Sequence, residues 1–146
     1  RIVAAHDVGR AINPLTLEGQ IEGGIVMCIG YALTEHYILE DGKPWTSVMA
    51  RYKTPSITHA PPITSHIVEH ELSTGPFGAK GMGELPSIVT APAITNAIYN
   101  ATGVRVRSLP VDQDSLLHAI RTGATEVELG WGDRDPIPTI EFGASH

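Results

Sequence analysis

Residues 13–33 read NPLTLEGQIEGGIVMCIGYAL, and this stretch predicts a helix from about Pro14 to Leu33. Its apolar residues recur every three or four positions on one helix face: Leu17, Ile21, Ile25 and Cys28. From Ile25 onward the stretch is apolar nearly all round, so we expect the second half of the helix to be buried on most sides.

Four glycines interrupt this predicted helix: Gly19, Gly23, Gly24 and Gly30. Each interior glycine destabilises a helix by about 1 kcal/mol relative to Ala. Glycines are usually kept in a helix because another segment of backbone or a ligand passes close to the missing side chains. For residues 19–24 two interpretations stay equally open: close packing of the helix on a sheet, or approach of a flat polar ligand to the Gln20 amide.

The segments on either side of the helix predict strands and loops. Residues 2–6 and 64–72 are expected to be strands, and residues 54–62, with three prolines, an irregular loop. Residues 35–39 and 45–48 fit a hairpin that turns at Asp41-Gly42. A glycine-dense loop then runs from Gly75 to Pro86.

Two more helices are expected after this loop. The first begins between Pro86 and Pro92, with Thr90 as a possible cap, and ends at Gly103. After a strand at 104–109, Asp112 predicts the N-cap of a helix over 113–122. The predicted fold is therefore α+β, with helices packed on a mixed β-sheet.

The 146 residues suffice for one compact domain, which we place at residues 1–123. Residues 124–146 combine Gly, Pro and acidic residues with few apolar ones, which predicts an extended C-terminal tail. Because residues 1–5 show neither an initiator Met nor a signal-peptide pattern, we expect a piece of a larger, cytoplasmic chain.

Composition excludes several classes of partner. The formal net charge is −6, and the ten basic residues are scattered, so nucleic acid and anionic membrane surfaces are not expected partners. No apolar run approaches the roughly 20 residues of a membrane span. The single cysteine, Cys28, cannot form an internal disulfide or hold an iron–sulfur cluster, so redox chemistry here requires a cofactor from elsewhere.

The loop Gly78-Ala-Lys80-Gly-Met-Gly83-Glu84 is one candidate for chemistry. Its glycines would let backbone N–H groups converge on an anion, next to the positive end of the following helix, with Glu84 at the mouth. A phosphate-binding P-loop is excluded because Gly81, not Ser or Thr, follows Lys80. A tight structural turn with a capping glutamate remains an alternative.

Other candidates are weaker. His66 and His70 share a strand face, but no third metal ligand is evident, so we predict a surface pair and no metal ligand in this chain. Cys28 lies in an apolar helix, which predicts an inert core thiol.

Three motifs in order carry a family resemblance: DVGRAINP at residues 7–14, GQIEGG at 19–24 and GMGELP at 81–86. Over about residues 2–122 the chain strongly resembles the C-terminal part of the molybdenum-binding (large) subunit of the xanthine dehydrogenase / aldehyde oxidase family of molybdenum hydroxylases. The resemblance implies the C-terminal portion of a molybdopterin-binding domain.

By position, the resemblance implies that Glu84 is the catalytic general base, that Gln20 hydrogen-bonds the pterin cofactor, and that the Gly83 backbone lies beside the metal. The implied reaction hydroxylates an electron-poor carbon with water-derived oxygen. The implied cofactor is molybdopterin, as the Mo-pterin or the Mo-pterin cytosine dinucleotide, with [2Fe–2S] clusters and FAD held on other domains or subunits.

The implied partners are the remainder of the molybdenum-binding subunit, iron–sulfur and flavin subunits, and a small-molecule substrate. Because the other cofactor-binding loops of the family precede the matched region, we expect the chain alone to be inactive. The alternative is a non-catalytic scaffold or assembly module that keeps the fold without cofactor.

Overall fold

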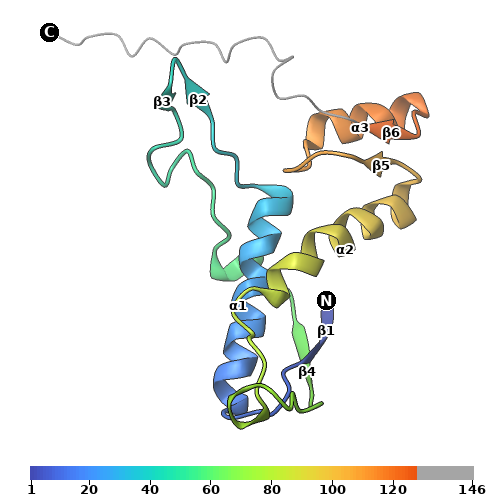
Figure 1. Cartoon of the computed structure of the whole chain (residues 1–146). Helices are drawn as coiled ribbons and strands as arrows, with labels where there is room; N and C mark the ends of the chain where they lie inside the picture. Colours follow the sequence, from blue (N-terminus) through green and yellow to red (C-terminus); the bar gives the residue numbers. More distant parts are fainter. Residues whose placement is uncertain (128–146) are drawn as a thin grey trace, which may run out of the picture.

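The computed structural model describes residues 1–127, and in this part of the chain three helices accompany short strands (Figure 1). The helices are α1 (Pro14–Leu33), α2 (Leu85–Thr102) and α3 (Gln113–Thr122). The strands are β1 (Ile2–Asp7), β2 (Leu39–Glu40), β3 (Lys43–Pro44), β4 (Ile63–Val68), β5 (Arg105–Val106) and β6 (Glu126–Val127). Single turns of 3-10 helix lie at Ile57–His59 and Pro76–Gly78.

Helix α1 has the predicted bounds. Asn13 caps it, since its side-chain oxygen accepts a hydrogen bond from the Thr16 N–H at 3.3 Å, and Pro14 occupies the first turn. The second half is buried as expected, with Ile25 and Cys28 almost fully covered. Helix α2 and strand β4 both pack against this 20-residue helix.

Strands β1 and β4 form a parallel ladder, in register from Ile2 opposite Ile63 to Asp7 opposite Val68. The main core lies between this ladder and α1, and its buried members are Val8, Ile21, Ile25, Ile29 and Met82. The predicted strand 64–72 is too long at its C-terminal end. The backbone after Val68 turns away because Glu69 accepts from the Ala11 N–H and the His70 N–H donates to Asp7.

Helix α2 packs along α1 and begins at Leu85, directly after Glu84. The prediction that Thr90 caps this helix is wrong, because Pro86 occupies the first turn and Thr90 lies one turn inside. The buried Thr90 hydroxyl donates to the Pro86 carbonyl at 2.8 Å. Pro92 is accommodated within the helix, and α2 ends as predicted at Gly103, whose φ of 74° is left-handed.

The predicted hairpin is present but short. Asp41 and Gly42 form its turn, both at positive φ, and only Leu39–Glu40 and Lys43–Pro44 pair. The expected strands at 35–39 and 45–48 are wrong in length, because this segment stands away from the core with Tyr37, Leu39 and Val48 exposed.

Helix α3 has the predicted bounds, with Asp112 as N-cap and Gly123 in the left-handed region after its last residue. The first residues of the predicted tail form β6, which pairs in parallel with β5 and buries Val127. The predicted strand 104–109 is reduced to β5. The rest of the predicted tail, residues 128–146, lies outside the described residues.

The α+β prediction is confirmed, but within residues 1–127 the strands form three separate two-stranded ladders and not the one mixed sheet that we expected. Within residues 1–127 no helix has the length and apolar character needed to cross a membrane.

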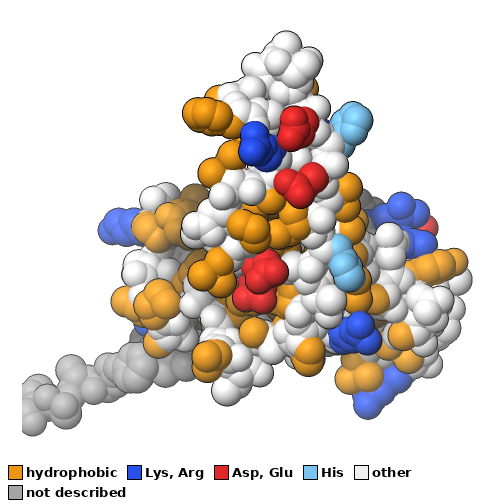
Figure 2. Space-filling view, turned by 90° about the horizontal axis from the view of Figure 1, so that it is seen from below, with side chains coloured by type: hydrophobic (Ala, Val, Ile, Leu, Met, Phe, Trp, Pro, Cys, Tyr) orange, Lys and Arg blue, Asp and Glu red, His pale blue; other side chains and the backbone are white. Residues whose placement is uncertain are grey.

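Several large apolar side chains remain exposed, including Leu15, Ile57 and Phe77 at 78%, 91% and 81%. Figure 2, which views the molecule from below, shows hydrophobic side chains reaching the surface across this face, while the Lys and Arg side chains stand apart from one another. Extensive exposed apolar surface is typical of a region that contacts another polypeptide.

Candidate functional site

The two glycine-rich motifs singled out from the sequence meet in space. The Gln20 side-chain amide donates a hydrogen bond to the Gly83 carbonyl at 2.8 Å, across 63 positions of sequence. Gln20 comes from the second turn of α1, and Gly83 immediately precedes Glu84 at the start of α2. The crossing of these two helices therefore brings Gln20, Gly83 and Glu84 to one place.

Two of the α1 glycines are explained by packing inside the chain. A Cβ added at Gly24 would lie 2.9 Å from the Cβ of Pro86, so glycine allows the first turn of α2 to lie directly on α1. A Cβ at Gly30 would collide with the Glu35 carboxylate and with Pro55. At Gly24 the structure shows close packing, as one of the two interpretations for residues 19–24 had it, but against a helix and not against the expected sheet.

The other glycines near Gln20 have no such explanation. A Cβ added at Gly19, Gly23, Gly81 or Gly83 would meet nothing within 4 Å, and none of the four has a positive φ. We call these four positions the open glycine surface. Glycine at positions 19 and 23 weakens the helix without relieving a contact in the described chain, so these positions are open to a group from outside it.

Glu84 directly follows Gly83, and its side chain is exposed. Its carbonyl accepts hydrogen bonds from the Ser87 N–H and hydroxyl, at 3.0 and 2.7 Å. Its carboxylate makes no capping hydrogen bond, which disfavours the alternative of a capping glutamate. The side chain is therefore available to a group that approaches from outside.

The loop before Glu84 also presents unpaired donors. Within the described chain, no hydrogen bond is made by the backbone N–H groups of residues 81–84. They stand at the N-terminal end of α2, where the helix dipole is positive. Together with the Gln20 amide, these groups suit a flat ligand with polar edges and negative charge, so the residues present fit a pterin with its phosphate.

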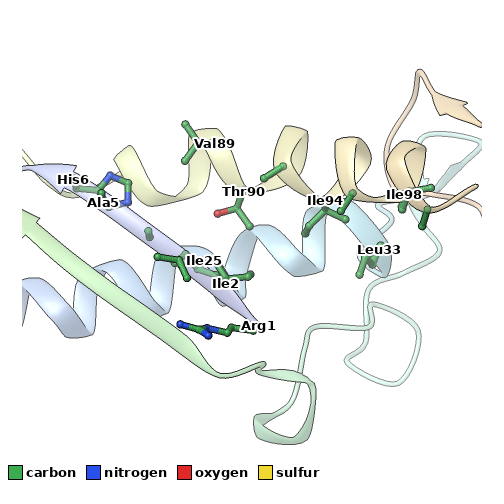
Figure 3. Close-up of a pocket in the computed structure, with 15 residues that line it drawn as sticks. Arg1, Ile2, Ala5, His6, Ile25, Leu33, Val89, Thr90, Ile94 and Ile98 are labelled. Carbon is green, nitrogen blue, oxygen red and sulfur yellow. The ribbon is translucent and has the colours of Figure 1, made fainter. Parts of the chain in front are cut away.

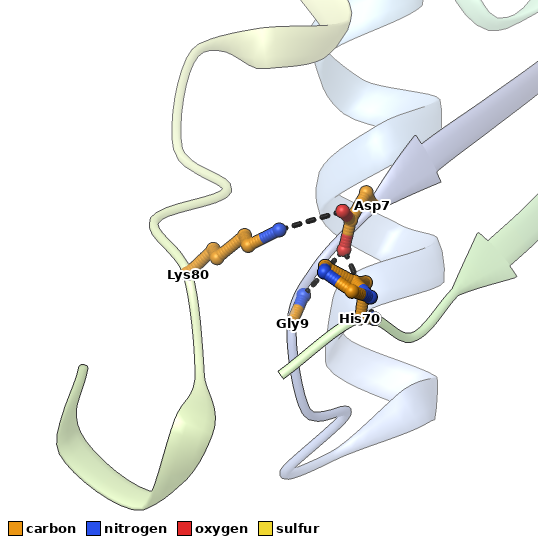
Figure 4. A network of polar contacts seen from close by, with 4 residues as sticks. All are labelled: Asp7, Gly9, His70 and Lys80. Carbon is orange, nitrogen blue, oxygen red and sulfur yellow. Dashed lines mark hydrogen bonds and ion pairs between the residues drawn. The ribbon is translucent and has the colours of Figure 1, made fainter. Parts of the chain in front are cut away.

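An Asp7-centred network holds this loop in place (Figure 4). The Asp7 carboxylate accepts hydrogen bonds from Lys80 Nζ at 2.6 Å, the Gly9 N–H at 2.9 Å and the His70 N–H at 3.2 Å. The Lys80 N–H also donates to the Val8 carbonyl at 2.9 Å. Asp7 thus ties the end of β1 to the loop that carries Gly83.

The sequence does not reveal Asp7 as a positioning residue. Its partner Lys80 is 73 positions away, so no local spacing in the sequence predicts the pair. In the structure His6 is buried and Asp7 half-buried, on opposite sides of β1. The one feature of the sequence that points to Asp7 is its position at the end of a predicted buried strand, because functional loops often begin there.

The network predicts a stability difference that is present near neutral pH and is lost in acid. The hydrogen bond from Lys80, and next that from the Gly9 N–H, lower the pKa of Asp7 below its usual 3.8. The stabilisation is complete above pH 3.8 and is lost as the pH falls through the lower folded-state pKa, because the unfolded chain binds the proton first. Asp7→Asn should be less stable than the wild type at pH 6, with the difference shrinking toward pH 2.5 in urea titrations.

Glu40→Gln is the matched control, since it removes one exposed carboxylate from β2, remote from the network. The difference in unfolding free energy between Glu40→Gln and the wild type should not shrink between pH 6 and pH 2.5 as it does for Asp7→Asn. A pH-independent difference for Asp7→Asn would show that the Asp7 charge does not hold the loop.

The weaker candidates do not form a second site. Among residues 1–127 no group of three or more His, Cys, Asp or Glu side chains is placed to hold a metal ion, so His66 and His70 find no third ligand. Cys28 is buried in α1, and burial raises the pKa of its thiol, as expected of an unreactive core cysteine.

Comparison with known proteins places residues 1–61, including Gln20, in a family described as "Molybdopterin cofactor-binding domain". The chain is 40% identical over 113 residues to the putative xanthine dehydrogenase molybdenum-binding subunit of Escherichia coli, covering 76% of this chain and 15% of that protein. It is also 40% identical over 120 residues to the 6-hydroxypseudooxynicotine dehydrogenase complex subunit gamma of Paenarthrobacter nicotinovorans, covering 80% and 15%.

A solved structure shares the fold. The aldehyde oxidoreductase from Desulfovibrio desulfuricans superposes with a TM-score of 0.73 at 43% identity, over 80% of this chain and 13% of that one. The chain thus spans about 15% of the length of the curated relatives it matches.

Proposed function

Because this chain belongs to the xanthine dehydrogenase / aldehyde oxidase family of molybdenum-binding subunits, we propose that it supplies the general base and one wall of the cofactor site of a molybdenum hydroxylase. It carries a molybdopterin cofactor-binding domain. The observation that supports the proposal is the hydrogen bond between Gln20 and Gly83, which brings the cofactor-binding candidates and Glu84 together.

Gln20 is the residue that orients the pterin. One of its amide hydrogens is used on Gly83, which fixes the side chain and leaves the carbonyl oxygen and the second N–H to pair with a polar ring edge. The open glycine surface lets a flat group approach the backbone on both sides of this amide. When bound, the molybdopterin supplies the redox chemistry, and [2Fe–2S] and flavin groups held elsewhere carry the electrons away.

Glu84 acts as the proton acceptor. The Glu84 carboxylate lies at the start of α2 and is free of competing hydrogen bonds in the described chain, so it is available to accept a proton. It removes the proton of the water-derived oxygen that adds to an electron-poor carbon of the substrate. Groups from outside this chain then complete the site, since Glu84 is exposed here.

The direct test is metal and pterin analysis of the protein purified from its own cells through a tag on this chain. Molybdenum and pterin in equal amounts, one per chain, are expected. A stable complex that contains neither would favour the alternative, a scaffold that keeps the fold without cofactor.

Gln20→Glu should weaken cofactor retention without unfolding the protein. The substitution replaces an N–H donor with a carboxylate that repels the Gly83 carbonyl and the anionic end of the cofactor. Loss of one such hydrogen bond predicts about 3- to 10-fold less pterin retained after gel filtration. Gln113→Glu, the same change at the exposed start of α3, should retain pterin as the wild type does. Equal retention in both variants would remove Gln20 from the site.

A further inference from the structure

Strand β1 has an edge that no strand of the described chain covers. In residues 1–127 its only ladder partner is β4. The Ile2 and Val8 N–H groups donate to the Pro62 and Val68 carbonyls, at 3.0 and 2.9 Å, so the even-numbered amides of β1 face β4. Because amides alternate along a strand, those of Val3 and Ala5 face the opposite side. Such an edge is a template for pairing with another strand.

An apolar groove of about 730 Å³ runs along this edge (Figure 3). Helix α2 forms the opposite wall, and α1 contributes Ile25 and Leu33. Ala93, Ala97 and Ala101 lie at four-residue spacing along the α2 wall, so small side chains leave room between that helix and β1. The groove is therefore wide and uncharged along most of its length.

One polar group in the groove lacks a partner. His6 lines the groove and is only 9% exposed, yet its Nε2 makes no hydrogen bond in the described chain. Buried imidazole nitrogens are almost always paired. A polypeptide along this edge would pair with the Val3 and Ala5 amides, and the unpaired His6 nitrogen indicates that the packing here is incomplete in the described chain.

We propose that an extended segment from the remainder of the molybdenum-binding subunit adds as a strand to the free edge of β1 and packs its apolar side chains on the alanine face of α2. This chain spans only about 15% of its relatives' length, which leaves ample polypeptide to supply the segment. A helix could fill the apolar groove but could not satisfy the strand edge. The inference rests on the family assignment behind the proposed function.

Amide hydrogen exchange on the protein purified from its own cells tests the pairing at single residues. Ala4 and His6 are internal references, because their amides already face β4. If a strand covers the edge, the Val3 and Ala5 amides should exchange about 100-fold or more slowly than in an unstructured chain, as the references do. Fast exchange of Val3 and Ala5 beside slow exchange of Ala4 and His6 would overturn the inference.

A photo-crosslinker identifies the segment. Val89 lines the groove and is 54% exposed, so p-benzoylphenylalanine at this position should be tolerated. The sequenced cross-link should come from a part of the molybdenum-binding subunit outside these 146 residues. A cross-link to a second copy of this chain, to its residues 128–146, or to nothing would contradict the inference. Molybdenum content of the same sample reports the proposed function separately, so either idea can fail alone.

Discussion

Glu84→Gln is expected to leave molybdopterin bound while lowering the turnover number by about 10²–10⁴-fold, the usual contribution of a general base. The amide has nearly the shape of the carboxylate but cannot accept a proton. The Glu84 carboxylate makes no hydrogen bond in the described chain, so its replacement removes no interaction that holds the fold together. The loss should therefore appear in kcat, measured on the purified complex with its cofactors loaded.

Two measurements separate this loss from damage to the site. Pterin and molybdenum content should match the wild type, and so should the urea unfolding midpoint. Glu40→Gln is the matched control, because Glu40 is also an exposed glutamate but lies on β2, away from Gln20 and the loop before α2. Near-normal turnover of Glu84→Gln with full cofactor would reject Glu84 as the base, whatever the behaviour of the control.

Helix α1 could be predicted from the sequence because its signals are local. Asn13 and Pro14 start it, and its apolar residues persist to Leu33. The start of α2 was harder to predict, because Thr90 and Pro92 form a plausible cap and first turn. The structure instead uses Pro86 there and buries Thr90, a choice set by the contact with α1.

The candidate site also has features that the sequence predicts and features that only the structure shows. The sequence does not say why a glycine stands in a helix. A glycine that lets a neighbouring element pack closely and a glycine that leaves open space are the same residue in the sequence. Only the structure distinguishes Gly24, which contacts Pro86, from Gly23, where an added Cβ would meet nothing within 4 Å in the described chain. The ion pair between Asp7 and Lys80 forms only when the chain folds, so no sequence spacing predicts it. The roles proposed for Gln20, Gly83 and Glu84 come from the family resemblance, and their proximity follows from the crossing of the helices.

The same contrast predicts opposite effects of one substitution at adjacent positions. Gly24→Ala places a methyl group 2.9 Å from the rigid ring of Pro86 and should force α2 away from α1. Overpacking of this kind lowers the free energy of unfolding by about 1–3 kcal/mol. The methyl group of Gly23→Ala meets no neighbour within 4 Å, so the gain in helix propensity should raise the free energy of unfolding by about 0.5–1 kcal/mol. Urea titration of both purified variants measures the difference.

Gly23→Ala is the more informative variant when the molybdopterin content of the purified protein is also measured. If the open glycine surface exists to admit the cofactor or an adjoining segment, the variant that stabilises the chain should retain less molybdopterin, because its methyl group fills the space left for them. Gly24→Ala should lose cofactor only to the extent that it unfolds. A Gly23→Ala protein that is both more stable and fully loaded would show that glycine at this position serves neither purpose, and the case for the surface would then rest on Gly81 and Gly83 alone.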